Sequence, residues 1–138
     1  MNLQKSTTIA LCSILEAAHD PSRQISSANI AEKYAVSLHH LAKVLRRLGR
    51  AGLLESTRGV GGGYRFIGNA KRVTLMDIID LFEDMIVEPA ERREKEYANG
   101  VERAIAQVLL EIDDMAKSVF KSITIATMLS LVERQSRV

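Results

Sequence analysis

The chain has 138 residues, of which 46% are hydrophobic and only 4% aromatic, enough apolar material for one domain with a core. Its apolar runs are short and interrupted by charge, and its first residues lack the pattern of a signal peptide, so we expect neither a membrane span nor secretion. Cys12 is the only cysteine, which excludes an internal disulfide or a cysteine cage for a metal within one chain and makes a reducing cytoplasm the expected setting.

The net charge of +2 is unevenly distributed along the chain. Residues 1–72 hold 11 basic and 4 acidic side chains, a net charge of +7, whereas residues 73–138 hold 8 and 13, a net charge of −5. We interpret this asymmetry as a half that binds a polyanion joined to a half that is solvated or binds a partner. Chance clustering of the charges is the alternative.

Two short helices are predicted before residue 35. The first covers residues 6–19, and its apolar stripe consists of Ile9, Cys12, Leu15 and Ala18. Cys12 is interpreted as a buried structural cysteine, because a free thiol packs as a small hydrophobe; a redox role is the alternative. The segment Asp20-Pro21-Ser22 ends this helix, and Ser26 or Ser27 caps the second, whose apolar face consists of Ile30, Ala31 and Tyr34.

The third predicted helix begins after Ser37 and ends at Gly52, where glycine suits a left-handed turn. A single stripe for burial is formed by Leu38, Leu41, Leu45 and Leu48. The outer face is basic and carries His39, His40, Lys43, Arg46, Arg47 and Arg50. Two helices joined by a short turn, the second of them basic, are typical of a helix-turn-helix, although an ordinary solvated helix face is the alternative.

A β-hairpin is predicted next, from residues 53–57 and 64–67, with a glycine-rich tip between them. We interpret the tip as a wing that approaches DNA closely, with Gly61 and Gly62 giving the backbone freedom. Arg58 is placed to enter a minor groove and Arg65 to meet a phosphate. A nucleotide-binding loop is disfavoured, because no long helix follows and no Lys-Ser/Thr pair is present, and a merely flexible hairpin is the alternative.

The second half begins with a helix started by Thr74 or Asp77, followed by a charged loop at residues 88–100. A long helix follows, and its narrow apolar seam consists of Val101, Ile105, Val108, Ile112, Met115 and Val119. We interpret the seam as a dimerisation surface; packing against the chain's own domain is the alternative. Residues 123–131 are expected to form one more short helix.

The stretch 45–64, LRRLGRAGLLESTRGVGGGY, together with VTLMDII at 73–79, resembles the Rrf-type family of bacterial winged-helix regulators (IscR-, NsrR- and CymR-like proteins). The resemblance implies a homodimeric transcription regulator, with a recognition helix in the major groove and Arg58 in the minor groove. Several members sense through three cysteines before the long helix, but residues 84–104 contain neither cysteine nor histidine. This chain is therefore expected to lack an iron–sulfur cluster. Some members also read a base with a glutamate where this chain has Ala42, so its DNA target should differ.

From these features we predict a mainly α fold with a small β-hairpin: a winged helix-turn-helix domain (1–84), a linker loop (85–100), and a dimerisation helix with a C-terminal tail (101–138). The predicted function is that of a cytoplasmic, sequence-specific DNA-binding regulator, expected to be a repressor that binds a pseudo-palindromic operator as a homodimer. A winged-helix protein–protein interaction module is the alternative. No catalytic triad, metal-ligand spacing or phosphate loop is present, so we expect no enzyme, metal or cofactor. The sequence leaves the signal open: a small-molecule or protein effector and oxidation of Cys12 are the candidates, and the absence of any sensing is the alternative.

Each DNA contact is expected to have its own role. His39, His40 and Arg46 are expected at base edges. Phosphate contacts that make affinity salt-dependent are expected from Lys5, Lys43, Arg47 and Arg50.

Overall fold

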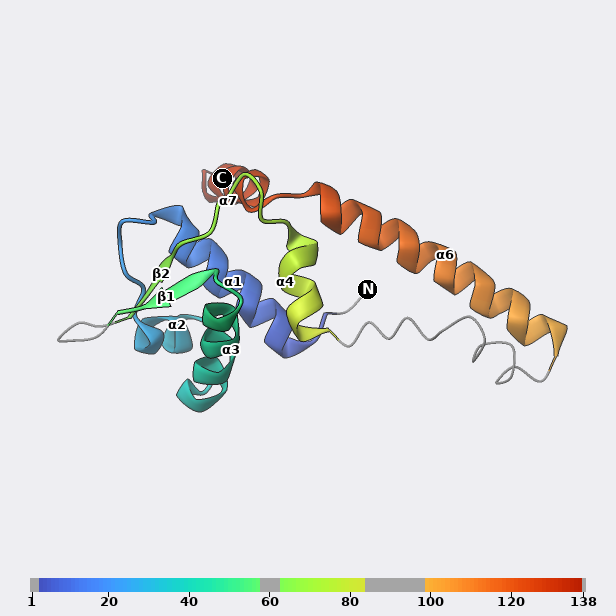
Figure 1. The fold of residues 1–138 in the computed structure, drawn as a ribbon, viewed down its shortest axis with the longest axis horizontal. Coiled ribbons are helices and arrows are strands. Elements are labelled where there is room, and N and C mark those ends of the chain that lie inside the picture. Colours follow the sequence, from blue (N-terminus) through green and yellow to red (C-terminus); the bar gives the residue numbers. More distant parts are fainter. Residues whose placement is uncertain (1–2, 58–62, 84–98, 138) are drawn as a thin grey trace.

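The structure is a computed structural model that describes residues 3–57, 63–83 and 99–137 (Figure 1). The elements follow in the order α1 (Lys5–His19), α2 (Ser27–Lys33), α3 (Leu38–Arg50), β1 (Leu54–Ser56), β2 (Tyr64–Phe66), α4 (Leu75–Phe82), α6 (Gly100–Ser122) and α7 (Ile125–Ser136). The predicted fold class, mainly α with a small hairpin, is confirmed. None of the helices in the described segments is long and apolar enough to cross a membrane.

Helix α1 lies at the centre of the core and packs against α3, α4, α7 and β2. Its buried face is turned from the predicted one, because Ile14 and Ala17 are fully buried whereas Cys12 and Leu15 are only half-buried. Two polar residues share that face: Ser13 Oγ donates to the Ile9 carbonyl (2.7 Å), and Thr7 Oγ1 donates to Glu83 Oε1 (2.8 Å). These hydrogen bonds allow both hydroxyls to be buried. The predicted apolar stripe is therefore confirmed at Ile9 and Ala18 and wrong at Cys12 and Leu15.

The turn between α2 and α3 is defined by two serine caps. Ser26 Oγ accepts the N–H of Asn29 at the start of α2, and Ser37 Oγ accepts the N–H of His40 at the start of α3 (3.1 Å). Between the two helices Ala35 adopts a left-handed conformation with φ of 52°, which a non-glycine residue adopts only at some cost. The predicted helix-turn-helix, with its short break at residues 35–36, is therefore confirmed.

Helix α3 ends as predicted, with Gly52 in the left-handed region at φ of 79°. The N–H of Gly52 donates to Gly49 O (3.0 Å) and the N–H of Leu53 donates to Leu48 O (3.1 Å), which is the pairing of a Schellman motif. The predicted leucine stripe is wrong at one position: Leu38 is 56% exposed, and Val44, at 2%, completes the buried face instead. Leu38 occupies the first helical position, where the chain is still entering the core.

Strands β1 and β2 form an antiparallel hairpin in which Leu54 faces Phe66 and Ser56 faces Tyr64. A third segment joins them, because the backbone of Ile25 exchanges hydrogen bonds with Tyr64 at 2.7 and 2.9 Å. This close approach requires glycine at the neighbouring position, since a Cβ on Gly63 would lie 2.1 Å from the Ile25 carbonyl oxygen. The hairpin is therefore fixed to the segment that leads into α2.

Helix α4 is started by a reciprocal capping box, in which Thr74 Oγ1 accepts the N–H of Asp77 (3.3 Å) and Asp77 Oδ2 accepts the N–H of Thr74 (2.9 Å). Most of the loop predicted at 88–100 lies outside the described residues. After α6, the chain returns to the core: Thr124 pairs with Thr74, Ile125 is fully buried, and α7 packs on α1. The last helix is longer than the short one expected at 123–131. The proposed boundaries at 84, 100 and 101 stay a prediction.

Candidate nucleic-acid interface

Helix α3 separates its apolar and basic side chains on opposite faces. The buried face consists of Leu41, Val44, Leu45 and Leu48. At about 100° per residue, the positions directly opposite are His39, Lys43, Arg46 and Arg50. All four side chains are exposed, and α3 contains no acidic residue. The structure thus brings four of the six predicted α3 contacts into one outward stripe, which we call the basic stripe.

The other two predicted contacts, His40 and Arg47, lie to one side of the basic stripe. The guanidinium of Arg47 lies over the ring of Phe82 in α4, 5.5 Å from its centroid. A cation–π contact of this kind can leave the guanidinium N–H groups able to donate to a phosphate. The Nε2 atom of His40 is buried and has no hydrogen-bond partner among the described residues, so in this conformation it is not available to a base edge.

The end of the hairpin that leads into residues 58–62 is closed by paired contacts between Thr57 and Gly63. The N–H and Oγ1 of Thr57 both donate to Gly63 O (2.8 and 3.0 Å), and the N–H of Gly63 donates to Thr57 Oγ1 (3.0 Å). Three predicted wing contacts, Arg58, Gly61 and Gly62, lie outside the described residues. Sequence reasoning missed Gly63 as the position that fixes the wing, because four glycines in five positions give no sign of which one another backbone approaches.

Arg65, the remaining predicted wing contact, lies opposite Glu55 in the hairpin register. Its Nη2 donates to Glu55 Oε2 (3.3 Å), and both side chains are substantially exposed. An exposed pair of this kind contributes little to stability, so Glu55 does not prevent Arg65 from meeting a phosphate. Lys5, expected at a phosphate, is exposed in the first turn of α1.

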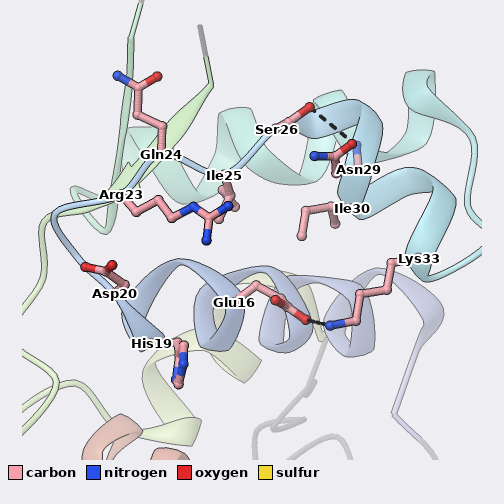
Figure 2. Close-up of a pocket in the computed structure, with 10 residues that line it drawn as sticks. All are labelled: Glu16, His19, Asp20, Arg23, Gln24, Ile25, Ser26, Asn29, Ile30 and Lys33. Carbon is pink, nitrogen blue, oxygen red and sulfur yellow. Dashed lines mark hydrogen bonds and ion pairs between the residues drawn. The ribbon is translucent and has the colours of Figure 1, made fainter. Parts of the chain in front are cut away.

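A cleft of about 230 Å³ lies between α1 and α2 (Figure 2). Figure 2 shows Arg23, Ile30 and Glu16 around it, with Lys33 reaching back from α2 to the Glu16 carboxylate. Burial raises the pKa of Glu16, but hydrogen bonds from Lys33 and Tyr34 outweigh it and hold that pKa below its ordinary value. The pKa of the Tyr34 hydroxyl is raised by burial and by the Glu16 carboxylate that accepts from it. This network ties α2 to α1 and thereby helps to set the position of the helix-turn-helix.

Helix α6 has an apolar seam but no buried residue. The six predicted seam residues are between 52% and 71% exposed, and Leu109 beside them is 58% exposed. Ala104, Ile105, Val108 and Leu109 line a shallow apolar groove on the same helix. The alternative that this seam packs against the chain's own domain is therefore wrong for the described residues.

The sequence matches the Rrf2 family, described as an iron-dependent transcriptional regulator, over residues 3–131. BadM of Rhodopseudomonas palustris, assigned as an HTH-type transcriptional regulator, is 49% identical over 137 residues, which are 99% of this chain and 86% of BadM. IscR of Erwinia tasmaniensis is 29% identical over 136 residues, 98% of this chain and 81% of IscR. Among solved structures, CymR, the global cysteine regulator of B. subtilis, superposes with a TM-score of 0.76 at 27% identity, covering 95% of this chain and 98% of CymR.

The donor atoms of this chain do not fit an iron–sulfur cluster. Such a cluster needs several thiolates, and the single cysteine, Cys12, lies half-buried in α1. Burial and the nearby Glu16 carboxylate raise the pKa of its thiol, which disfavours the thiolate that a metal requires. In residues 3–57, 63–83 and 99–137, no group of three His, Cys, Asp or Glu side chains is placed to hold a metal ion.

The relatives are transcriptional regulators rather than enzymes, and they favour DNA over a protein as the ligand of the basic stripe and the wing. The fold, the helix-turn-helix and the match over residues 3–131 agree with one another: the chain is a DNA-binding transcriptional regulator and belongs to the Rrf2 family.

Proposed function

We propose that this regulator is a homodimeric repressor that binds a pseudo-palindromic operator, with α3 in the major groove and the wing in the adjacent minor groove. The observation that carries the proposal is the basic stripe: three exposed cations and His39, directly opposite the buried face of a helix that has no acidic residue and follows a short turn. A helix of this kind can present base-reading and phosphate-binding groups together.

We assign each expected DNA contact to a base edge or to a phosphate by the position of its side chain. His39 and Arg46 are assigned to base edges, and His40 would join them only after its ring turns. Lys43 and Arg50 are assigned to phosphates, as is Arg47, whose N–H groups can still donate beside Phe82. Lys5 and Arg65 would add phosphate contacts at the flanks. In the wing, Arg58 would enter the minor groove while Gly61 and Gly62 allow the backbone to approach.

Dimerisation is assigned to α6. Its seam repeats at alternating spacings of four and three and is exposed along its whole length, so a second copy of the same helix would bury it. Two-fold symmetry of the protein then matches two-fold symmetry of the operator. The signal that controls binding would be a small molecule or a partner protein in the cytoplasm rather than a cluster.

The test is a set of binding isotherms for the full-length protein, prepared aerobically without added iron, on genomic fragments around its own promoter at two salt concentrations. We expect sequence-selective binding that weakens steeply with salt. Arg46→Ala and Arg58→Ala should each weaken operator binding by about 1–3 kcal/mol. Lys43→Ala should weaken binding to all sequences and lower the salt slope by about 1.

Lys121→Ala serves as the matched control, because Lys121 is an exposed cation in the last turn of α6, outside α3 and the hairpin. Equal, weak binding to all fragments would contradict the proposal, as would variants of the basic stripe that behave like Lys121→Ala. Repression itself is checked by in vitro transcription from the bound promoter, where added protein should lower the transcript.

A further inference from the structure

The first residue of the recognition helix, Leu38, is a large apolar side chain that the fold leaves in solvent. It is 56% exposed, whereas Leu41, Val44, Leu45 and Leu48 on the same helix are 2% exposed or less. Figure 1 shows the first turn of α3 at the edge of the molecule, away from the core. Leu38 therefore lies at the end of the helix that a helix-turn-helix presents to DNA.

No local structural function accounts for leucine at this position. The helix start is satisfied by Ser37, whose hydroxyl accepts the N–H of His40. The positions that form a hydrophobic staple across an N-cap belong to Val36 and Leu41, which pack in or against the core. Replacing Leu38 by a smaller residue should therefore leave the fold intact.

The direction of the side chain also favours a contact with DNA. In an α-helix each Cα–Cβ bond tilts toward the N-terminus, so the first residue projects beyond the helix end rather than back over the core. The adjacent residue, His39, begins the basic stripe. Leu38 lies about 100° around the helix from His39, so at the helix tip it stands beside the basic stripe rather than within it.

The apolar feature of a major groove is the C5-methyl group of thymine, which no other standard base carries. Contact between this methyl group and the Leu38 methyl groups would remove apolar surface of both from water. We propose that Leu38 is a specificity-determining residue that reads a thymine in each half-site through its methyl group. This inference rests on the proposed operator binding and adds a base contact that no hydrogen-bonding residue of α3 supplies.

The experiment begins with the selection of high-affinity sites from a random-sequence duplex pool by the full-length protein. Each thymine of the selected site is then replaced by deoxyuridine, which removes the methyl group and keeps every hydrogen-bonding atom of the base edge. We expect one symmetric pair of positions at which the substitution weakens binding about fourfold per half-site, the effect of one buried methyl group.

The decisive readout is the same scan with Leu38→Ala. This variant should bind the thymine site more weakly and should show no further loss with deoxyuridine at that pair of positions, while other positions behave as in the wild type. Leu38→Met keeps an apolar side chain of similar length and should retain the methyl effect. Ile67→Ala removes an equally exposed apolar side chain beyond β2 (49% exposed for Ile67) and should change neither affinity nor the scan.

The two possible failures are distinguishable. If wild-type protein and Leu38→Ala respond identically to deoxyuridine at every position, Leu38 does not read a methyl group, although operator binding stands. If no sequence is enriched by the wild-type protein, the proposed operator binding fails, and this inference fails with it.

Discussion

The winged-helix region and helix α6 use apolar residues in opposite ways. The described residues before 84, together with α7, bury their large side chains in one core, from Ile14 in α1 to Ile125 in α7. Helix α6 extends away from that core in Figure 1 and exposes every residue of its apolar seam by half or more. Apolar surface of this extent on one helix indicates burial against another molecule. The comparison teaches that the first region buries its own apolar residues, whereas α6 leaves its seam exposed for the dimerisation proposed above.

The largest expected effect comes from a charge placed in the α6 seam. Ile112→Asp should prevent dimerisation, because the carboxylate would have to be buried between two helices without a partner. Operator affinity should fall by about 100-fold or more, since two linked half-sites bind far more tightly than separate ones. Light scattering coupled to size exclusion measures the mass, and fluorescence anisotropy measures the affinity.

Gln107→Asp is the control for the seam variant, because it adds the same charge to an exposed position of α6 outside the seam. The urea midpoint of the winged-helix region should be unchanged in both variants, because α6 contributes no buried residue. A monomeric wild-type protein, or an Ile112→Asp variant that remains a dimer, would contradict the assignment of dimerisation to the α6 seam.

A smaller effect, on stability, is expected when glycines with different surroundings are replaced by alanine. Gly63→Ala should lower the free energy of unfolding by about 2–3 kcal/mol, because its Cβ would meet the Ile25 carbonyl oxygen and force the hairpin from the segment before α2. Gly100→Ala, at the start of α6, places a Cβ with nothing within 4 Å and should change stability little. Urea unfolding followed by circular dichroism measures both, and coincident curves would show that the Ile25–Tyr64 bridge is dispensable.

The smallest effect compares two helix caps. Thr74→Ala removes the capping box of α4 and should lower the free energy of unfolding by about 1 kcal/mol, because α4 is part of the core. Asn99→Ala removes the equivalent side-chain acceptor at the start of α6 (Asn99 Oδ1 to the N–H of Glu102, 3.0 Å). That change should speed amide exchange in the first turn of α6 without altering the unfolding of the core. Hydrogen exchange separates the two outcomes, and an equal loss of global stability from both variants would show that α6 unfolds together with the core.

Local signals in the sequence were reliable where one residue type has one physical use. Ser37 as a cap and Gly52 in a left-handed turn were predicted and are confirmed, and of the two predicted starts of α4, Thr74 and Asp77, Thr74 is the N-cap. The errors arose where several apolar stripes were available. In α1, Cys12 and Leu15 were predicted to be buried, but the fully buried face includes Ser13 and Ile14, because α1 is covered from several sides by α3, α4 and α7.

In the candidate site, too, some features were predictable from the sequence and others only from the structure. The basic character of α3 was evident from its composition, but defining the basic stripe required the buried face of α3, and the contact of Arg47 with Phe82 required the position of α4. Leu38 was predicted to be buried because its spacing fits the leucine stripe, but it is exposed at the first position of the helix, one turn before Leu41, the first fully buried residue of α3. Gly63 could not be distinguished from its neighbours until the Ile25 backbone was placed beside it.

The sequence by itself determined the order and kind of the elements, the ends of most helices, the charge of α3 and the absence of cysteines for a cluster, because each depends on residue types close together in the chain. Only the tertiary structure decided which face of each helix is buried, which glycine permits close approach, and that α7 returns to the core while the α6 seam stays open. Those features depend on contacts between segments far apart in the chain, and local periodicity does not encode them.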